Sequence, residues 1–113
     1  MPHAVIHYSN NMSDTIKTNK VVSAIHQMMI DCGLFDAENI KTRAYATNNY
    51  LVGTKGNEGS FAHLTVSILA GRTTEQRKTL SESLLSALKN ALPMANSLTV
   101  EIREMDKETY QKI

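Results

Sequence analysis

The stretch FAHLTVSILAGRT, residues 61–73, decides the fold. Its first nine residues alternate between two largely apolar faces, which is typical of a strand in the middle of a sheet. The turn that follows ends at Arg72. Thr73 and Gln76 then have the Thr-x-x-Gln spacing of a capping box, so the stretch predicts a central strand, a turn and the start of a helix.

The second half of the chain completes one strand–helix–strand unit. Apolar residues recur at helical spacing after the capping box, and Pro93 ends the helix. Alternating residues at 98–103 then predict the last strand, so the unit covers about residues 61–105. The buried side of its helix is expected to contain Leu80, Leu84, Ala87, Leu88 and Ala91.

The first half of the chain has the same order of elements. Alternation at residues 2–8 predicts a strand, and apolar residues at intervals of four, three and four from Val21 to Cys32 predict an amphipathic helix. Gly33 suits the left-handed position that ends such a helix. A strand at 40–46 completes a unit of about residues 2–46, and the three glycines of residues 47–60 indicate a loop or small hairpin.

Two such units in tandem predict an α+β, two-layer fold in one domain, residues 1–113. Both helices are expected on one face of a four-stranded sheet. A ferredoxin-like sheet has the same order of elements, so the pattern leaves the strand order open. The sheet face without helices would expose Val5, Thr65 and Phe61, which favours a homo-oligomer.

The composition narrows the classes of partner and compartment. The 113 residues include 12 basic and 11 acidic side chains, and a net charge of +1 gives no electrostatic argument for a nucleic-acid or membrane partner. No apolar stretch approaches the ~20 residues that span a bilayer. Cys32 is the only cysteine, so neither an intramolecular disulfide nor a thiolate cluster for zinc is expected, and the cytoplasm is the expected compartment.

The Met-Pro start of the chain has two interpretations. Pro2 is either an ordinary second residue or, after removal of Met1, a free secondary amine that acts as a general base. A chain-terminal amine has a pKa of about 7.7 to 8.0, and burial beside cations favours its neutral form. Such an amine can move a proton at neutral pH.

Three cations are candidates for binding an anionic substrate. Arg72 lies between a strand and a capped helix, where its planar guanidinium can grip a carboxylate with two hydrogen bonds. Lys41 and Arg43 share one face of a strand, about 7 Å apart. Each cation alone is equally an ordinary surface residue, but together they suit a substrate with more than one carboxylate.

The histidines and the cysteine are assigned no chemistry. His3 and His7 are about 13 Å apart on one strand face, too far to chelate one metal, and no metal site is expected. His63, in an apolar strand, is expected to be a hydrogen-bonded core residue rather than a catalytic one. Cys32 lies in an apolar stripe and is expected to pack inertly.

Five segments resemble the 5-carboxymethyl-2-hydroxymuconate isomerase family of the tautomerase superfamily. The resemblance runs from Pro2 to about Tyr110, and residues 61–72 are its most specific part. The chain departs from the family pattern Ile-Arg-x-Arg at one position, where Lys41 replaces the first arginine. The lysine keeps the charge but loses the bidentate guanidinium. The segments are PHAVIHYSNN from Pro2, GLF from Gly33, IKTRA from Ile40, FAHLTVSILAGR ending at Arg72, and VEIREMD from Val100.

The resemblance implies a tautomerase-like fold of tandem β-α-β units with a mixed sheet, assembled as a homotrimer. It also implies a cofactor-free 1,3 proton shift that ketonises the dienol 5-carboxymethyl-2-hydroxymuconate in the homoprotocatechuate branch of aromatic degradation. In that reaction Pro2 would take the 2-hydroxyl proton and return one at carbon 5. Arg72 would bind the 2-oxo acid end, and Lys41 and Arg43 would be further carboxylate contacts.

Two alternatives to this function remain open at the level of sequence. One is a promiscuous tautomerase that acts on other 2-hydroxydienoates or on phenylpyruvate-like enols. The other is a non-catalytic trimer that keeps the fold as a binding or scaffold protein. In both enzyme hypotheses the substrate is a small dicarboxylate or tricarboxylate or related enol acid, and no nucleic acid or membrane takes part.

Overall fold

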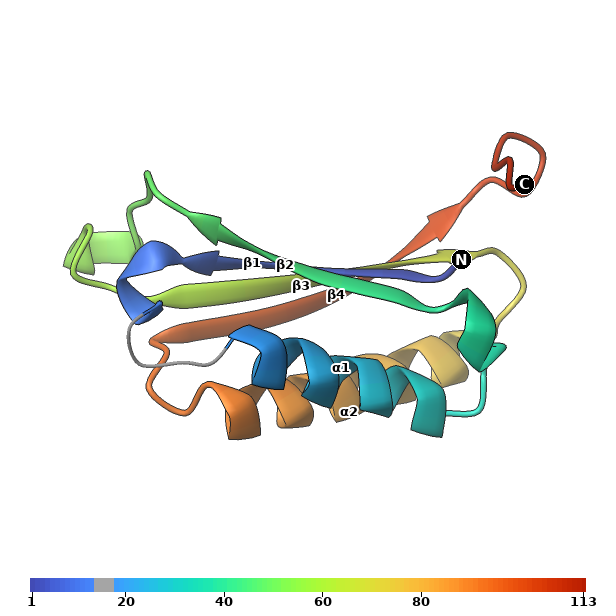
Figure 1. Ribbon diagram of the computed structural model, residues 1–113, viewed down its shortest axis with the longest axis horizontal. Coiled ribbons are helices and arrows are strands. Elements are labelled where there is room, and N and C mark those ends of the chain that lie inside the picture. Colours follow the sequence, from blue (N-terminus) through green and yellow to red (C-terminus); the bar gives the residue numbers. More distant parts are fainter. Residues whose placement is uncertain (14–17) are drawn as a thin grey trace.

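A computed structural model describes residues 1–13 and 18–113, which form a layer of strands over a layer of helices (Figure 1). The strands are β1 (His3–Ser9), β2 (Lys41–Thr47), β3 (Phe61–Leu69) and β4 (Ser97–Met105). The helices α1 (Thr18–Asp31) and α2 (Thr74–Ala91) cover the same face of the sheet. Short 3₁₀ turns occupy η1 (Asn10–Met12), η2 (Ala37–Asn39) and η3 (Gly53–Lys55).

The strand order β2-β1-β3-β4 answers the question that the sequence pattern left open. β1 and β2 are parallel, β3 and β4 are parallel, and the central β1–β3 pair is antiparallel. Each helix therefore joins two adjacent parallel strands, whereas a ferredoxin-like sheet is built from split βαβ units. The expected mixed sheet with both helices on one face is confirmed, and β3 is a central strand as predicted.

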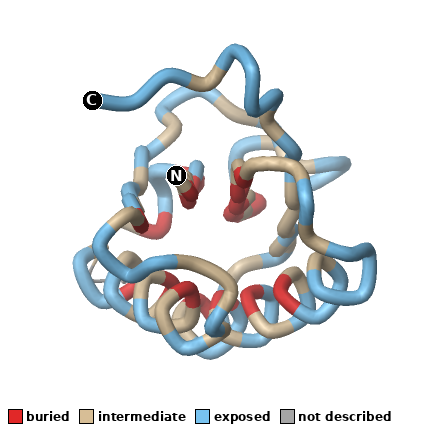
Figure 2. Tube along the Cα trace, turned by 90° about the vertical axis from the view of Figure 1, so that its right-hand side faces the viewer, coloured by how far each residue is buried: buried red, intermediate tan, exposed pale blue. Residues whose placement is uncertain are grey.

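The core lies between the sheet and the helices, where the buried parts of the chain gather (Figure 2). Every second residue of β3 is buried, because successive side chains of a strand point to opposite faces. From the other layer, α1 buries Val21, Ile25 and Met29. The buried residues of α2 are the predicted leucines, Leu80, Leu84 and Leu88.

Two local predictions at helix ends are confirmed. The hydroxyl of Thr73 accepts a hydrogen bond from the backbone N–H of Gln76, and the Gln76 side chain accepts one from the backbone N–H of Thr73. This capping box fixes the start of α2 directly after the turn that contains Arg72. At the end of α1, Gly33 has a φ of 72°, which is the left-handed conformation that glycine adopts without strain.

The segment expected to be a loop or small hairpin folds around a 3₁₀ turn. Its only strand-like pairing in the described residues is a single antiparallel bridge between Val52 and Gly56.

In the described parts of the chain, neither helix is long and apolar enough to cross a bilayer.

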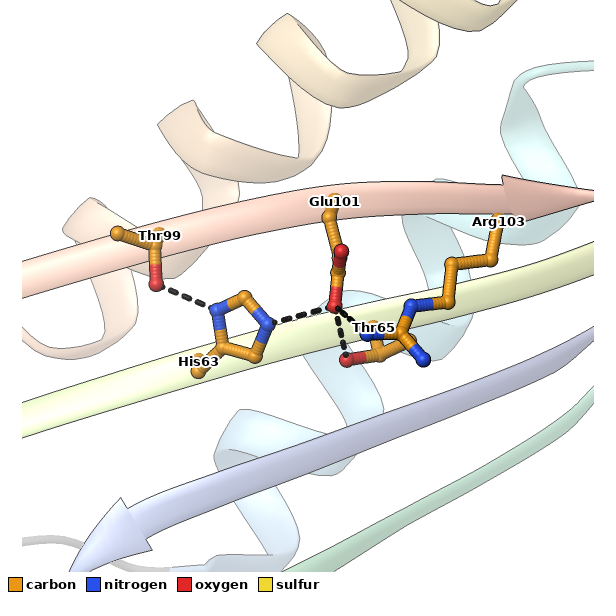
Figure 3. Close-up of polar contacts among 5 residues, drawn as sticks. All are labelled: His63, Thr65, Thr99, Glu101 and Arg103. Carbon is orange, nitrogen blue, oxygen red and sulfur yellow. Dashed lines mark hydrogen bonds and ion pairs between the residues drawn. The ribbon is translucent and has the colours of Figure 1, made fainter.

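A polar network occupies the sheet face that carries no helix (Figure 3). The carboxylate of Glu101 lies 3.0 Å from Nε2 of His63 and 3.1 Å from the guanidinium of Arg103, and it also accepts a hydrogen bond from Thr65. Nδ1 of His63 lies 2.6 Å from the hydroxyl of Thr99. The expectation that His63 is a core residue is therefore wrong: the apolar neighbours of His63 face the helices, so His63 faces the open side.

Replacing Glu101 by Gln is expected to flatten the loss of stability in acid. The hydrogen bond from His63, and then that from Arg103, hold the pKa of Glu101 below its ordinary value. A carboxyl with a lowered pKa in the folded state stabilises the fold above its unfolded pKa, and this contribution is lost as the pH falls through the folded pKa. Urea midpoints measured in acid should therefore fall less steeply for Glu101→Gln than for the parent.

The control for this experiment is Glu82→Gln, which removes an exposed carboxylate from α2 on the other layer. This variant should keep the slope of the parent. Equal slopes for Glu101→Gln and the parent would show that the network contributes nothing to acid stability.

Candidate active site

A pocket lies beside the amino terminus, at the end of the sheet where β3 ends and the segment after β4 begins. Figure 1 shows both chain ends on this side of the molecule. The pocket has a volume of about 380 Å³. It is lined by Met1, Phe35, Asp36, Asn39, Leu69, Arg72, Tyr110 and Lys112.

Pro2 lies directly before β1 and is fully buried. Its carbonyl oxygen accepts a hydrogen bond of 3.1 Å from the backbone N–H of Lys41, which starts the pairing of β1 with β2. The residue bonded to its nitrogen, Met1, is in the pocket lining. Pro2 is thus fixed by the end of the sheet next to a lining residue, but it is not itself part of the pocket lining.

The amine of Met1 is in an electropositive environment. Burial is the largest cause that lowers the pKa of this amine, followed by the charges of Lys41 and Lys112. The amine donates a hydrogen bond of 3.1 Å to the hydroxyl of Tyr110. The two lysine charges also favour a negative charge in this part of the pocket, whereas burial by itself disfavours a charge of either sign.

Arg72 is the one of the three predicted cations that lines the pocket. Its guanidinium donates 2.8 Å and 3.5 Å hydrogen bonds to the carbonyl oxygens of Leu34 and Leu69, and it lies 4.8 Å from the ring centre of Phe35. In the described residues no carboxylate forms an ion pair with it. The cation is thus positioned by backbone and ring, and it keeps its charge available for an external anion.

Lys41 and Arg43 lie on the neighbouring edge strand, outside the pocket lining. The ammonium of Lys41 donates to the carbonyl oxygen of Asn39 at 3.1 Å. Arg43 donates to Nδ1 of His3 at 3.2 Å, because β1 and β2 are parallel and place the two side chains on the same face. The charge of Lys41 lowers the pKa of the Met1 amine, whereas Arg43 contacts His3, which is also outside the pocket lining.

His3 connects Arg43 to the segment after β4. Because a guanidinium only donates, Nδ1 of His3 is the acceptor, and Nε2 carries the proton that is donated to the hydroxyl of Tyr110 at 2.9 Å. Burial, followed by the charges of Arg43, the amino terminus and Lys41, lowers the pKa of His3. A neutral His3 therefore joins the start of β1 to Tyr110 in the segment after β4.

Sequence reasoning missed several residues of the pocket. Phe35 and Asn39 lie in the connection between α1 and β2, and Lys112 lies in the tail after β4. The only signal for Lys112 was a basic residue just beyond Tyr110, where the family resemblance ends. Over the described residues, no group of three or more His, Cys, Asp or Glu side chains is placed to hold a metal ion.

Comparison with known proteins gives the class to which this fold and site belong. The family model described as 5-carboxymethyl-2-hydroxymuconate isomerase matches residues 2–113. A 5-carboxymethyl-2-hydroxymuconate Delta-isomerase of Escherichia coli is 22% identical over 89 residues, which are 79% of this chain and 71% of that protein.

Two solved structures show the same fold. That of a 5-carboxymethyl-2-hydroxymuconate isomerase from Deinococcus radiodurans R1 has a TM-score of 0.88 and 22% identity, with 99% of this chain and 88% of that chain covered. A fused 4-OT protein, described as a wild-type symmetric trimer, has a TM-score of 0.76 and 18% identity, with 97% and 90% covered.

The two-layer sheet is thus the tautomerase-like fold of these solved structures. The chain belongs to the 5-carboxymethyl-2-hydroxymuconate isomerase family, and it is an isomerase.

Proposed function

We propose that the chain is a cofactor-free tautomerase in which Pro2, freed by removal of Met1, moves a proton with its secondary amine. The proposed substrate is a 2-hydroxydienoate such as 5-carboxymethyl-2-hydroxymuconate, the compound in the family description. The observation that carries the proposal is the pocket that joins the amino terminus to Arg72 and Lys112. Among the described residues, neither of these cations is in an ion pair.

The electrostatics support a neutral amine as the base. Burial and the charges of Lys41 and Lys112 lower the pKa of the amine that now ends the chain. Pro2 is fully buried and bonded to Met1, so we expect its own amine, once free, to have a pKa below the ordinary value of about 7.7 to 8.0 for the same reasons. A base with a pKa near the working pH is the most effective in proton transfer.

The geometry also supports a direction for the transfer. In the unprocessed chain, the bond from the nitrogen of Pro2 to the carbonyl carbon of Met1 points toward a residue that lines the pocket. When Met1 is removed, an N–H bond takes the place of that bond, and the lone pair, no longer delocalised into an amide, becomes basic on the same side of the nitrogen. The volume of Met1 is then added to the space for substrate.

The proposed reaction needs only this amine and the cations. The nitrogen of Pro2 takes the proton of the 2-hydroxyl, and the O–H electron pair becomes the carbonyl π bond. The two carbon–carbon π pairs shift along the chain, and carbon 5 receives a proton from the Pro2 ammonium. Arg72 would hold the 2-oxo acid end and stabilise the negative charge that develops on oxygen, with Lys41 and then Arg43 as more distant contacts.

We further propose a single-domain cytoplasmic homotrimer. The fused 4-OT structure, which has the same fold, is described as a symmetric trimer. On the sheet face without helices, Val5, Phe61 and Thr65 are only half-buried in one chain, and a second copy would cover them. Light scattering that gives the mass of one chain would reject the trimer.

The function is tested by the intact mass of untagged protein from its own host, followed by an assay of dienol ketonisation. Loss of one Met together with ketonisation of 5-carboxymethyl-2-hydroxymuconate is the expected result. Retention of Met1 would make the nitrogen of Pro2 an amide without a basic lone pair, which would refute the amine mechanism and favour a non-catalytic trimeric binding protein.

A broader tautomerase is the second candidate, and the position of Lys41 favours it. Its ammonium is held by the carbonyl oxygen of Asn39 and lies outside the pocket lining, where it makes a looser carboxylate contact than a bidentate guanidinium. Ketonisation of the phenylpyruvate enol at a rate similar to that of the dienol tricarboxylate would support this candidate.

A further inference from the structure

Two lysines that are far apart in the sequence, Lys41 and Lys112, bind one residue of the pocket lining, Asn39. The ammonium of Lys112 donates to the side-chain oxygen of Asn39 at 2.6 Å, and that of Lys41 donates to its backbone carbonyl at 3.1 Å. Lys112 belongs to the segment after β4, and Lys41 is the first residue of β2. Both ammonium groups are thus bound to neutral oxygens rather than to carboxylates.

The pocket lining has more positive than negative charges, which favours binding of an anion. The acidic residue of the lining is Asp36, whose carboxylate accepts a hydrogen bond from the backbone N–H of Glu38 at 3.1 Å. No ion pair joins Asp36 to Arg72 or Lys112 in the described part of the chain. Two fixed cations and the chain-terminal amine therefore face one carboxylate that already has a backbone partner.

Arg72 and Lys112 are held by different parts of the pocket wall. Arg72 is held by the carbonyl oxygens of Leu34 and Leu69, whereas Lys112 is held by Asn39. A pocket of about 380 Å³ is within the usual range of small-molecule sites. A ligand with two carboxylates can therefore be held at two points, while a ligand with one carboxylate can use only one of them.

We propose that Lys112 is a specificity-determining residue, which binds the second carboxylate of the ligand and selects dicarboxylates over monocarboxylates of the same length. Lys41, attached to the same Asn39, adds charge to this distal position. The inference rests on the proposed function, because that function makes this pocket the substrate site. It adds a contact to that site from a segment for which the sequence indicated no chemistry.

The test compares the binding of two saturated six-carbon acids, adipate and hexanoate, to the processed protein by calorimetric titration at fixed salt. Lys112→Gln is expected to weaken adipate about tenfold, as for loss of one charge-assisted hydrogen bond in a partly solvated site, and to change hexanoate less than about twofold. Lys112→Arg should restore the preference for adipate. Lys89→Gln removes the same charge from the last turn of α2, away from the pocket, and should behave like the parent.

A purely structural role for Lys112 predicts a different result. If the lysine only ties the tail to Asn39, Lys112→Gln weakens both acids by the same factor, and this equal loss would overturn the proposal. An unchanged ratio of the two affinities, or no binding of adipate by the parent, would also overturn it.

The experiment separates this inference from the proposed function because it needs no turnover. If Lys112→Gln selectively loses affinity for adipate but the parent ketonises no dienol, the proposed tautomerase activity is refuted and Lys112 remains the anion contact. Ketonisation by the parent with no change of preference in Lys112→Gln would refute the role of Lys112 alone.

Discussion

Replacing Pro2 by Ala is expected to reduce turnover on the dienol by about 10² to 10⁴, the usual contribution of a positioned general base. Alanine also leaves a free amine once Met1 is removed, but that amine is primary and no longer fixed by a pyrrolidine ring. In the parent, the ring is fully buried and the carbonyl of the same residue is bound to the N–H of Lys41, so the nitrogen has one orientation. The measurement is kcat for ketonisation, followed by the loss of dienol absorbance.

Binding provides the control for this variant. The affinity for adipate should change little, because the carboxylate contacts lie on Arg72 and Lys112 rather than on Pro2. The intact mass must show that Met1 is removed from both proteins. Equal turnover of the variant and the parent would exclude Pro2 as the base.

Replacing Arg72 by Ala is expected to lower kcat/KM for the dienol by about 10², which corresponds to a charge-assisted contact of roughly 2 to 3 kcal/mol. Arg72→Lys should recover only part of the loss, because lysine cannot bond two carbonyl oxygens and a carboxylate with one planar group. Leu34 and Leu69 would also lose the donor for their carbonyl oxygens in the alanine variant.

The control for this prediction is Arg77→Ala. Arg77 is near the start of α2, and its guanidinium pairs with Glu104 at 3.6 Å instead of lining the pocket. Its loss should leave kcat/KM close to that of the parent. A steady-state profile unchanged by Arg72→Ala would remove Arg72 from the site.

Local chemistry explains which parts of the fold could be predicted. The capping box of Thr73 and Gln76 and the left-handed Gly33 depend on neighbouring residues, so their positions were predicted correctly. The strand order depends on pairing between β1 and β3, which are far apart in the sequence, and no local pattern reports it. His63 was misplaced because apolar alternation shows that a strand is central but does not show which face the helices cover.

In the candidate site, too, only the residue fixed by local sequence could be predicted correctly. Arg72 follows directly from the turn between β3 and α2, and it lines the pocket. Arg43 was grouped with it by charge, but its guanidinium contacts His3 because of the parallel register of β1 and β2, which the sequence does not contain. Lys112 was missed because the tail has neither periodicity nor a motif, and its placement results from the contacts of Tyr110 and Asn39.

The tail that carries Lys112 is held to the rest of the protein by contacts that can open without global unfolding. Tyr110 and Lys112 hold the tail to His3 and Asn39 through side-chain hydrogen bonds, one exposed and one partly buried. Segments held by few buried contacts open locally at a much smaller free energy than the whole fold. Because only the docked form presents Lys112, a molecule with an open tail would bind a dicarboxylate through Arg72 without the second contact proposed above.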